Sequence, residues 1–140
     1  MKKILLLLLV LFTASCSTEI PTTQFQEWGD YSFRLESRPP HVKPGMNEFL
    51  LVGNFKKRYR AYDLIVYFRM GPQGKWSQAI QDGHTGVYRK ALLVRDVNTD
   101  VLYVHVKQNK NIKMSDEPMD EQVFEFPLNY SSSSESKSGA

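Results

Sequence analysis

The chain has 140 residues, of which 41% are hydrophobic and 12% aromatic, and its formal net charge is +3. This length fits one domain and excludes a multidomain enzyme, and the hydrophobic share excludes a chain that is disordered throughout. The single cysteine, Cys16, excludes an intrachain disulfide, a zinc site of several thiolates and a CxxC redox pair. We therefore expect one small domain folded around a hydrophobic core.

The first fifteen residues have the layout of a bacterial export signal. Lys2 and Lys3 precede an unbroken apolar run at residues 4–12, which is too short to span a bilayer as a helix. No second hydrophobic segment of that kind follows in the sequence. We therefore predict a cleaved signal at residues 1–15 and no lasting transmembrane helix.

The residues around the cysteine resemble the lipobox of bacterial lipoproteins. Ala14 and Ser15 directly precede Cys16, although Thr13 stands where that family usually has Leu. The resemblance implies that Cys16 carries acyl chains that anchor the protein in a membrane. Because Ser17 rather than Asp follows the cysteine, it also favours the periplasmic face of the outer membrane over the inner membrane. The alternative is an ordinary secretory signal, cut at or near Ala14.

Without its signal the chain keeps 16 Lys and Arg against 15 Asp and Glu, a formal charge of +1. This balance, together with export, argues against a nucleic-acid partner. Residues 16–30 are polar and predict a lipidated tether, whereas residues 129–140 contain four consecutive serines and predict a disordered tail. The folded domain is then expected at residues 31–128.

Within this domain, short segments of alternating apolar and polar residues are separated by turn residues, which predicts β-strands. Residues 64–70 are nearly continuously apolar, so we expect a central strand that is buried on both faces. Seven strands without helical periodicity favour a single immunoglobulin-like antiparallel β-sandwich, and a small closed barrel is the alternative. The seven segments are residues 31–36, 49–55, 64–70, 76–80, 88–94, 101–106 and 123–128.

The segment His84-Thr85-Gly86-Val87-Tyr88 resembles the D-x-G-x-Y pattern of a tyrosine corner, with His84 in place of the Asp. The resemblance implies a turn at Gly86 and a structural Tyr88 whose hydroxyl bonds back to the preceding connection.

A wider resemblance, to the periplasmic immunoglobulin-like domains of the FixH-like and YtkA-like families, covers residues 31–107. It rests on Pro44-Gly45-Met46-Asn47, the apolar strand at 48–52, the Gly86-Val87-Tyr88 turn and the strand at 102–106. The resemblance implies the same fold, and it offers copper handling or respiratory-oxidase assembly as an alternative function.

Residues that could carry chemistry are scattered. His84, His105 and Met70 are the candidate copper ligands, but they stand singly, without an HxH, an HxxxM or a Met-rich run. The acidic pairs at 116–117 and 120–121 lie in a polar connection, which indicates a solvated loop. Nucleophile elbow, P-loop and G-x-G-x-x-G patterns are absent from the sequence. We therefore predict no metal, no cofactor and no enzymatic activity.

The densest charge in the sequence is a basic loop formed by Lys56, Lys57, Arg58 and Arg60. Such a loop can contact an acidic protein or anionic headgroups, and Trp28, Tyr59 and Tyr62 could extend it. The alternative is a charged hairpin tip that keeps edge strands soluble. The function predicted from the sequence is a non-catalytic binding or assembly module, anchored by lipid, that faces the periplasm and binds an envelope protein.

Overall fold

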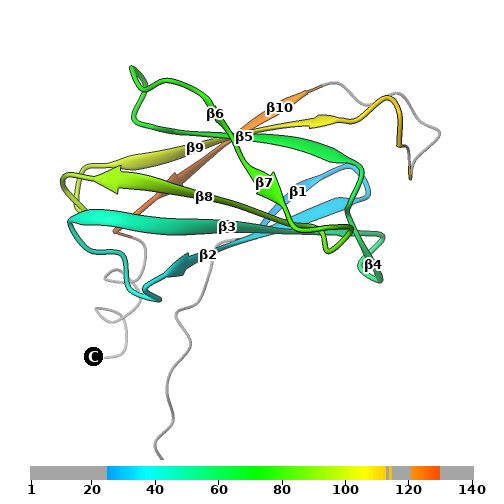
Figure 1. Cartoon of the computed structure of the whole chain (residues 1–140), viewed down its shortest axis with the longest axis horizontal. Helices are drawn as coiled ribbons and strands as arrows, with labels where there is room; N and C mark the ends of the chain where they lie inside the picture. The colour runs from blue at the N-terminus through cyan, green and yellow to red at the C-terminus, as the bar shows by residue number, and fades with distance from the viewer. Residues whose placement is uncertain (1–24, 113, 115–120, 130–140) are drawn as a thin grey trace, which may run out of the picture.

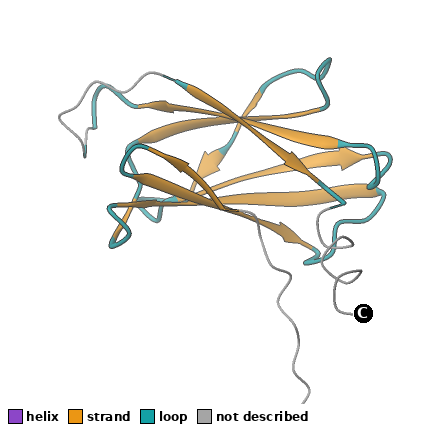
Figure 2. Cartoon of the chain, turned by 180° about the vertical axis from the view of Figure 1, so that it is seen from behind, coloured by secondary structure: helices purple, strands orange, loops and turns teal. Residues whose placement is uncertain are grey.

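The computed structural model describes residues 25–112, 114 and 121–129. These residues form ten strands and no helix, and every strand pair is antiparallel (Figures 1 and 2). Among them, therefore, no helix is long and apolar enough to cross a membrane. The predicted signal at 1–15, the lipid site Cys16 and residues 130–140 of the predicted tail lie outside the described residues.

The strands form two sheets that pack face to face, and Figure 1 shows β5, β9 and β10 above β2 and β3. Sheet 1 has the order β1-β2-β3-β8-β7, with β4 paired to β3, and sheet 2 has the order β10-β9-β5-β6. The strands of sheet 1 are β1 (Phe25–Trp28), β2 (Tyr31–Arg38), β3 (Gly45–Phe55), β4 (Tyr59–Arg60), β7 (Ile80–Gln81) and β8 (Val87–Val94). The strands of sheet 2 are β5 (Leu64–Met70), β6 (Ser77–Gln78), β9 (Val101–Gln108) and β10 (Gln122–Pro127).

This strand order is that of an immunoglobulin-like sandwich. The neighbours β2-β3-β8-β7 correspond to strands A, B, E and D of a constant-type domain, and β5-β9-β10 correspond to strands C, F and G. The predicted all-β sandwich is therefore confirmed, and the closed barrel is excluded because the two sheets are separate.

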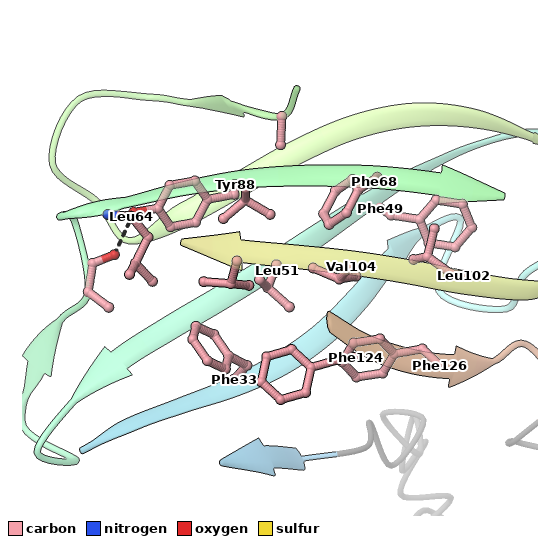
Figure 3. Close-up of a cluster of buried hydrophobic side chains, with 14 of the residues drawn as sticks. Phe33, Phe49, Leu51, Leu64, Phe68, Tyr88, Leu102, Val104, Phe124 and Phe126 are labelled. Carbon is pink, nitrogen blue, oxygen red and sulfur yellow. Dashed lines mark hydrogen bonds between the residues drawn. The ribbon is translucent and has the colours of Figure 1, made fainter. Parts of the chain in front are cut away.

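The core lies between the two sheets, where alternate residues of each strand point inward (Figure 3). Phe33 and Leu51 come from sheet 1, and Phe68, Val104 and Phe126 face them from sheet 2; all five are at most 2% exposed. Burial of such side chains is the main favourable contribution to the stability of a domain of this size.

The prediction that the strand at 64–70 is buried on both faces was wrong. In β5 the inward Leu64, Val66 and Phe68 are buried, whereas the alternate residues, among them Tyr67 and Arg69, are only half-buried. No described segment covers the outer face of sheet 2, so the apolar run includes two half-buried residues on that face, Ile65 and Tyr67.

Two boundaries also differ from the sequence prediction. β1 pairs with β2, so the sheet begins at Phe25 rather than at the predicted boundary of residue 31. The single strand expected at 76–80 is split, because Ser77–Gln78 belongs to sheet 2 and Ile80–Gln81 to sheet 1. The chain crosses between the sheets at buried Ala79, whose N–H donates to the carbonyl oxygen of Val66 at 2.8 Å.

Tyr88, the second residue of β8, joins the two sheets. Its hydroxyl donates to the carbonyl oxygen of Ala61 at 2.7 Å and accepts the N–H of Leu64 at 3.1 Å (Figure 3). Ala61 lies in the connection that leads into β5, and Leu64 is the first residue of β5. Neither partner lies in the connection directly before β8, so the local bonding expected of a tyrosine corner is not formed. Gly86 has φ +70°, and a Cβ there would come within 2.9 Å of the Gly53 carbonyl oxygen, so this turn requires glycine.

A second buried tyrosine, Tyr31, donates its hydroxyl to Oδ2 of buried Asp63 at 2.6 Å. Burial raises the pKa of Tyr31 well above its usual range, and the hydrogen bond to Asp63 and the charge of Asp63 raise it further. Burial likewise raises the pKa of the Tyr88 hydroxyl well above its usual range. Both hydroxyls therefore stay protonated in the folded protein wherever an exposed tyrosine would begin to ionise.

Candidate binding face on sheet 2

The outward side chains of β5 and β9 meet in register on the face of sheet 2 that points away from the core. Tyr67 lies opposite His105, and Arg69 lies opposite Tyr103. Trp76, just before β6, comes from the other side of β5 and also contacts this group. Strand alternation fixes this arrangement, because the residues between them, such as Phe68 and Val104, fill the core.

The side chains of this face stack on one another as alternating rings and cations. Lys107 Nζ lies 5.4 Å from the centroid of the Tyr67 ring, and the rings of Tyr67 and His105 are stacked at 5.8 Å. The His105 and Trp76 rings are 5.6 Å apart. Beyond them, Arg69 Cζ lies 4.4 Å from the Trp76 centroid and 4.9 Å from the Tyr103 centroid. We call these six residues the outer-face cluster: Tyr67, Arg69, Trp76, Tyr103, His105 and Lys107.

Arg69 is the most constrained member of the cluster. Its Nε atom is buried and has no hydrogen-bond partner within the described part of the chain. No carboxylate among the described residues forms an ion pair with it. The guanidinium group is therefore held by the faces of two rings, an arrangement that keeps its charge and fixes its plane.

The described acidic residues beside the cluster do not neutralise Arg69. Glu121 pairs with the His105 ring instead. Glu125 lies opposite Tyr103 on β10, so the whole width of β9, about 9–10 Å between outer strands, separates it from Arg69. The positive charge of Arg69 is therefore free to attract an anion from outside the domain.

The basic loop predicted from the sequence lies elsewhere, at the tip of the β3–β4 hairpin in sheet 1. Lys56 and Lys57 both have positive φ, 50° and 61°, and the N–H of Arg58 donates to the carbonyl oxygen of Phe55 at 3.3 Å, features of a type I′ turn. The N–H of Lys56 donates to the Asp30 carbonyl oxygen at 2.8 Å, which fixes the hairpin against the β1–β2 turn. All four cations of the loop are exposed, and none forms an ion pair with a described residue.

Of the three aromatic residues expected to extend the basic loop, Tyr59 is 57% exposed beside it. The other two have partners of their own: Trp28 stacks on Tyr31 at 5.8 Å, and Tyr62 meets the His84 ring edge-on at 5.2 Å. The loop therefore gains one exposed aromatic residue and remains separate from the outer-face cluster, which belongs to the other sheet.

The three candidate copper ligands are not brought together. His84 contacts Tyr62 in the turn before β8, His105 belongs to the outer-face cluster, and Met70 packs against the core at the end of β5. Among the described residues, no group of three or more His, Cys, Asp or Glu side chains could hold a metal ion.

Most of the outer-face cluster was missed from the sequence, because the strand at 64–70 was expected to be buried on both faces. The usable signal was alternation in two strands: positions 67 and 69 in β5, and 103, 105 and 107 in β9. Which of these residues meet depends on the β5–β9 register, and no local pattern in the sequence specifies it.

No protein-family model matches the sequence, and no curated protein matches it. Among solved structures, the chain is similar to the crystal structure of a Br derivative of BhCBM56, with 11% sequence identity and a TM-score of 0.44. The match covers 74% of this chain and 97% of that chain. We therefore assign no family and infer the function from the outer-face cluster.

Proposed function

We propose that the protein is a non-catalytic binding module, held at the envelope membrane by lipid on Cys16, that binds a protein partner on the outer face of sheet 2. The observation that carries this proposal is the outer-face cluster, in which Trp76, Arg69 and Tyr103 stack on an uncovered sheet face. Trp, Tyr and Arg are the residues most enriched among the energetic centres of protein interfaces.

The shape of this surface favours a protein over a small molecule. Small-molecule sites are concave and bury most of the ligand, whereas a sheet face is broad and open. Trp76 is 37% exposed, and Val123 on neighbouring β10 is 45% exposed, so apolar area extends across the face beside the charged groups. A partner that covers this face would remove both side chains from water.

The proposal of a lipid anchor is based on the sequence around Cys16. Eight residues, 17–24, lie between Cys16 and the start of β1 at Phe25, and the nine steps from Cys16 to Phe25 reach at most about 30 Å when fully extended. An anchored domain would therefore stay close to the membrane, and the basic loop would add a salt-sensitive attraction to an acidic partner or surface.

The proposal is tested by site-specific photo-crosslinking of the full chain in its native envelope. A photoreactive amino acid replaces Tyr103 on sheet 2 or, as the matched control, exposed Ala91 on the outer face of sheet 1. We expect one defined protein crosslinked from position 103 and not from position 91, and we expect Trp76→Ser to abolish it. Equal crosslinking from both positions, or none from 103, would refute the binding face.

The same preparations test the remaining predictions. Cys16→Ala should release the protein from the membrane fraction, and replacement of Lys56, Lys57, Arg58 and Arg60 by Ser should weaken capture mainly at low salt. About one equivalent of copper, lost on replacing His84, His105 or Met70, would instead establish the copper-handling alternative.

A further inference from the structure

We infer that Arg69 is the anchor point for a carboxylate of the bound partner, an inference that rests on the proposed binding face of sheet 2. The partner segment would then be acidic, with its Asp or Glu side chain seated on the guanidinium edge of Arg69. Apolar side chains on either side of that residue would cover the rings of Trp76 and Tyr103.

The position of Arg69 in the sheet prepares it for this role. β5 lies between β9 and β6, so Tyr103 flanks Arg69 from one side and Trp76 from the other, with ring centroids 4.9 Å and 4.4 Å from Cζ. Rings that flank a guanidinium group leave its edge, where the N–H donors lie, as the part available to a ligand. The side chain is held in place before binding, so little conformational entropy is lost when a ligand arrives.

The unmet bonding capacity of Arg69 indicates an anion. A guanidinium group has five N–H donors, and Arg69 uses none of them in a hydrogen bond to any described residue. Its Nε is buried and out of reach of water and ligand alike, but the side chain as a whole is only half-buried, so the terminal Nη donors are the ones that an anion would contact. Charge-assisted pairs of Arg with an acid are among the strongest polar contacts, and the surrounding rings lower the access of competing water.

The charge on this face favours a carboxylate over a phosphate. Arg69 is the one cation in its cross-strand row, between Trp76 and Tyr103, and Glu125 lies at the β10 end of that row. A phosphomonoester carries a charge near −2 and would need further cations, whereas a carboxylate carries −1 and matches one planar guanidinium group.

The test titrates the full chain with acetate, with methylphosphonate and with neutral acetamide, and follows the two tryptophan indole N–H resonances by NMR. Trp76 stacks on Arg69 and reports the site, whereas Trp28 stacks on Tyr31 in sheet 1 and serves as the internal control. We expect acetate to shift the Trp76 resonance saturably, acetamide to leave it unchanged, and methylphosphonate to act only at higher concentration.

Substitutions of Arg69 test whether acetate binding depends on its side chain. Arg69→Gln should weaken acetate binding about tenfold or more, because the charged hydrogen bonds are lost, and Arg69→Lys should fall between. Arg34→Gln on sheet 1 is the matched control, because Arg34 already pairs with Glu36, and it should bind acetate like the unaltered protein. An unshifted Trp28 resonance in each variant shows that the fold is intact.

The two proposals fail differently. If acetate does not shift Trp76, if the shift persists in Arg69→Gln, or if methylphosphonate binds more tightly than acetate, the carboxylate inference is overturned. Crosslinking from position 103 would still support the binding face in that case. If acetate binds and position 103 captures no protein, the anion site stands and the protein-binding function is refuted.

Discussion

Cations on the outer faces of the two sheets have different kinds of partner. On sheet 1, Arg34 Nε lies 2.8 Å from a Glu36 carboxylate oxygen, and Arg89 pairs with Glu48 at 3.7 Å and with Asp82 at 3.1 Å. On sheet 2, Arg69 and Lys107 lie over aromatic rings instead. A carboxylate neutralises a cation, whereas a ring attracts it without cancelling its charge. Arg34 and Arg89 are therefore neutralised within sheet 1, although the basic loop at its β3–β4 tip is not, and Arg69 on sheet 2 retains charge that a partner can use.

The surroundings of the apolar residues also differ between the two faces. At the centre of sheet 1, Leu50 points outward yet is only 5% exposed, because it lies between Glu36 and Arg89 on the neighbouring strands. On sheet 2, Trp76 and Val123 remain open to solvent. Charged side chains cover the centre of sheet 1 through their aliphatic stems, so the exposed apolar residues of that sheet, such as Met46 and Leu93, lie towards the strand ends, whereas Trp76 and Val123 lie beside the outer-face cluster of sheet 2.

The largest effect we expect comes from the loss of the Tyr88 hydroxyl, which links the two sheets. Tyr88→Phe leaves the Leu64 N–H and the Ala61 carbonyl oxygen without their partner in a buried site. We expect the free energy of unfolding at pH 7 to fall by about 1–3 kcal/mol, measured by urea denaturation. A change below about 0.5 kcal/mol would show that water replaces the hydroxyl.

The same variant has a defined pH dependence. Because the pKa values of Tyr31 and Tyr88 are raised in the folded state, their protonation stabilises the protein fully below the unfolded value, near pH 10, and this stability is lost as pH rises above it. Each tyrosine should contribute a loss of about 1.4 kcal/mol per pH unit. Tyr88→Phe should therefore show a shallower decline above pH 10 than the unaltered chain, and an identical slope would contradict the assignment.

An intermediate effect distinguishes the two faces directly. A double-mutant cycle on Arg69 and Trp76 should give a coupling free energy of about 0.5–2 kcal/mol that changes little between low and high salt. The corresponding cycle on Arg89 and Glu48 should give about 0–1 kcal/mol and decline as salt is added, because that pair is partly exposed. Equal salt dependence in both cycles would contradict the proposed difference between a cation stacked on aromatic rings and a cation paired with a carboxylate.

The smallest effect concerns the basic loop. Lys57 has φ +61°, which glycine adopts without strain, so Lys57→Gly should raise the free energy of unfolding by about 0.5–1 kcal/mol. Arg58→Gly is the matched control, because Arg58 has no positive φ and glycine there should only add freedom to the unfolded chain. Thermal denaturation of both variants measures the difference, and stabilisation by both would point to relief of charge repulsion instead.

The strands and the sandwich were predictable because alternation reports directly which side chains face a core, as in β2 with Tyr31 and Phe33. β1 was missed because its four residues, Phe25–Trp28, alternate too briefly to stand out from the polar segment before them. The split at Ala79 follows from packing between the sheets, and the meeting of Arg69 with Tyr103 follows from register. Both features depend on contacts between residues that are far apart in the sequence, so a local sequence pattern could not specify them.

The crossing at Ala79 also decides where the sandwich is exposed to self-association. It supplies one edge of each sheet, β6 and β7, and each of these strands has only two residues, too few to template another chain. The opposite edges are formed by the longer strands β1 and β10. Of these, β10 ends in Pro127, which lacks an N–H for further pairing. Because β6 and β7 pair with only two residues each of β5 and β8, the β1 edge and the remaining stretches of β5 and β8 are where unwanted strand addition, and the onset of fibril growth, would begin.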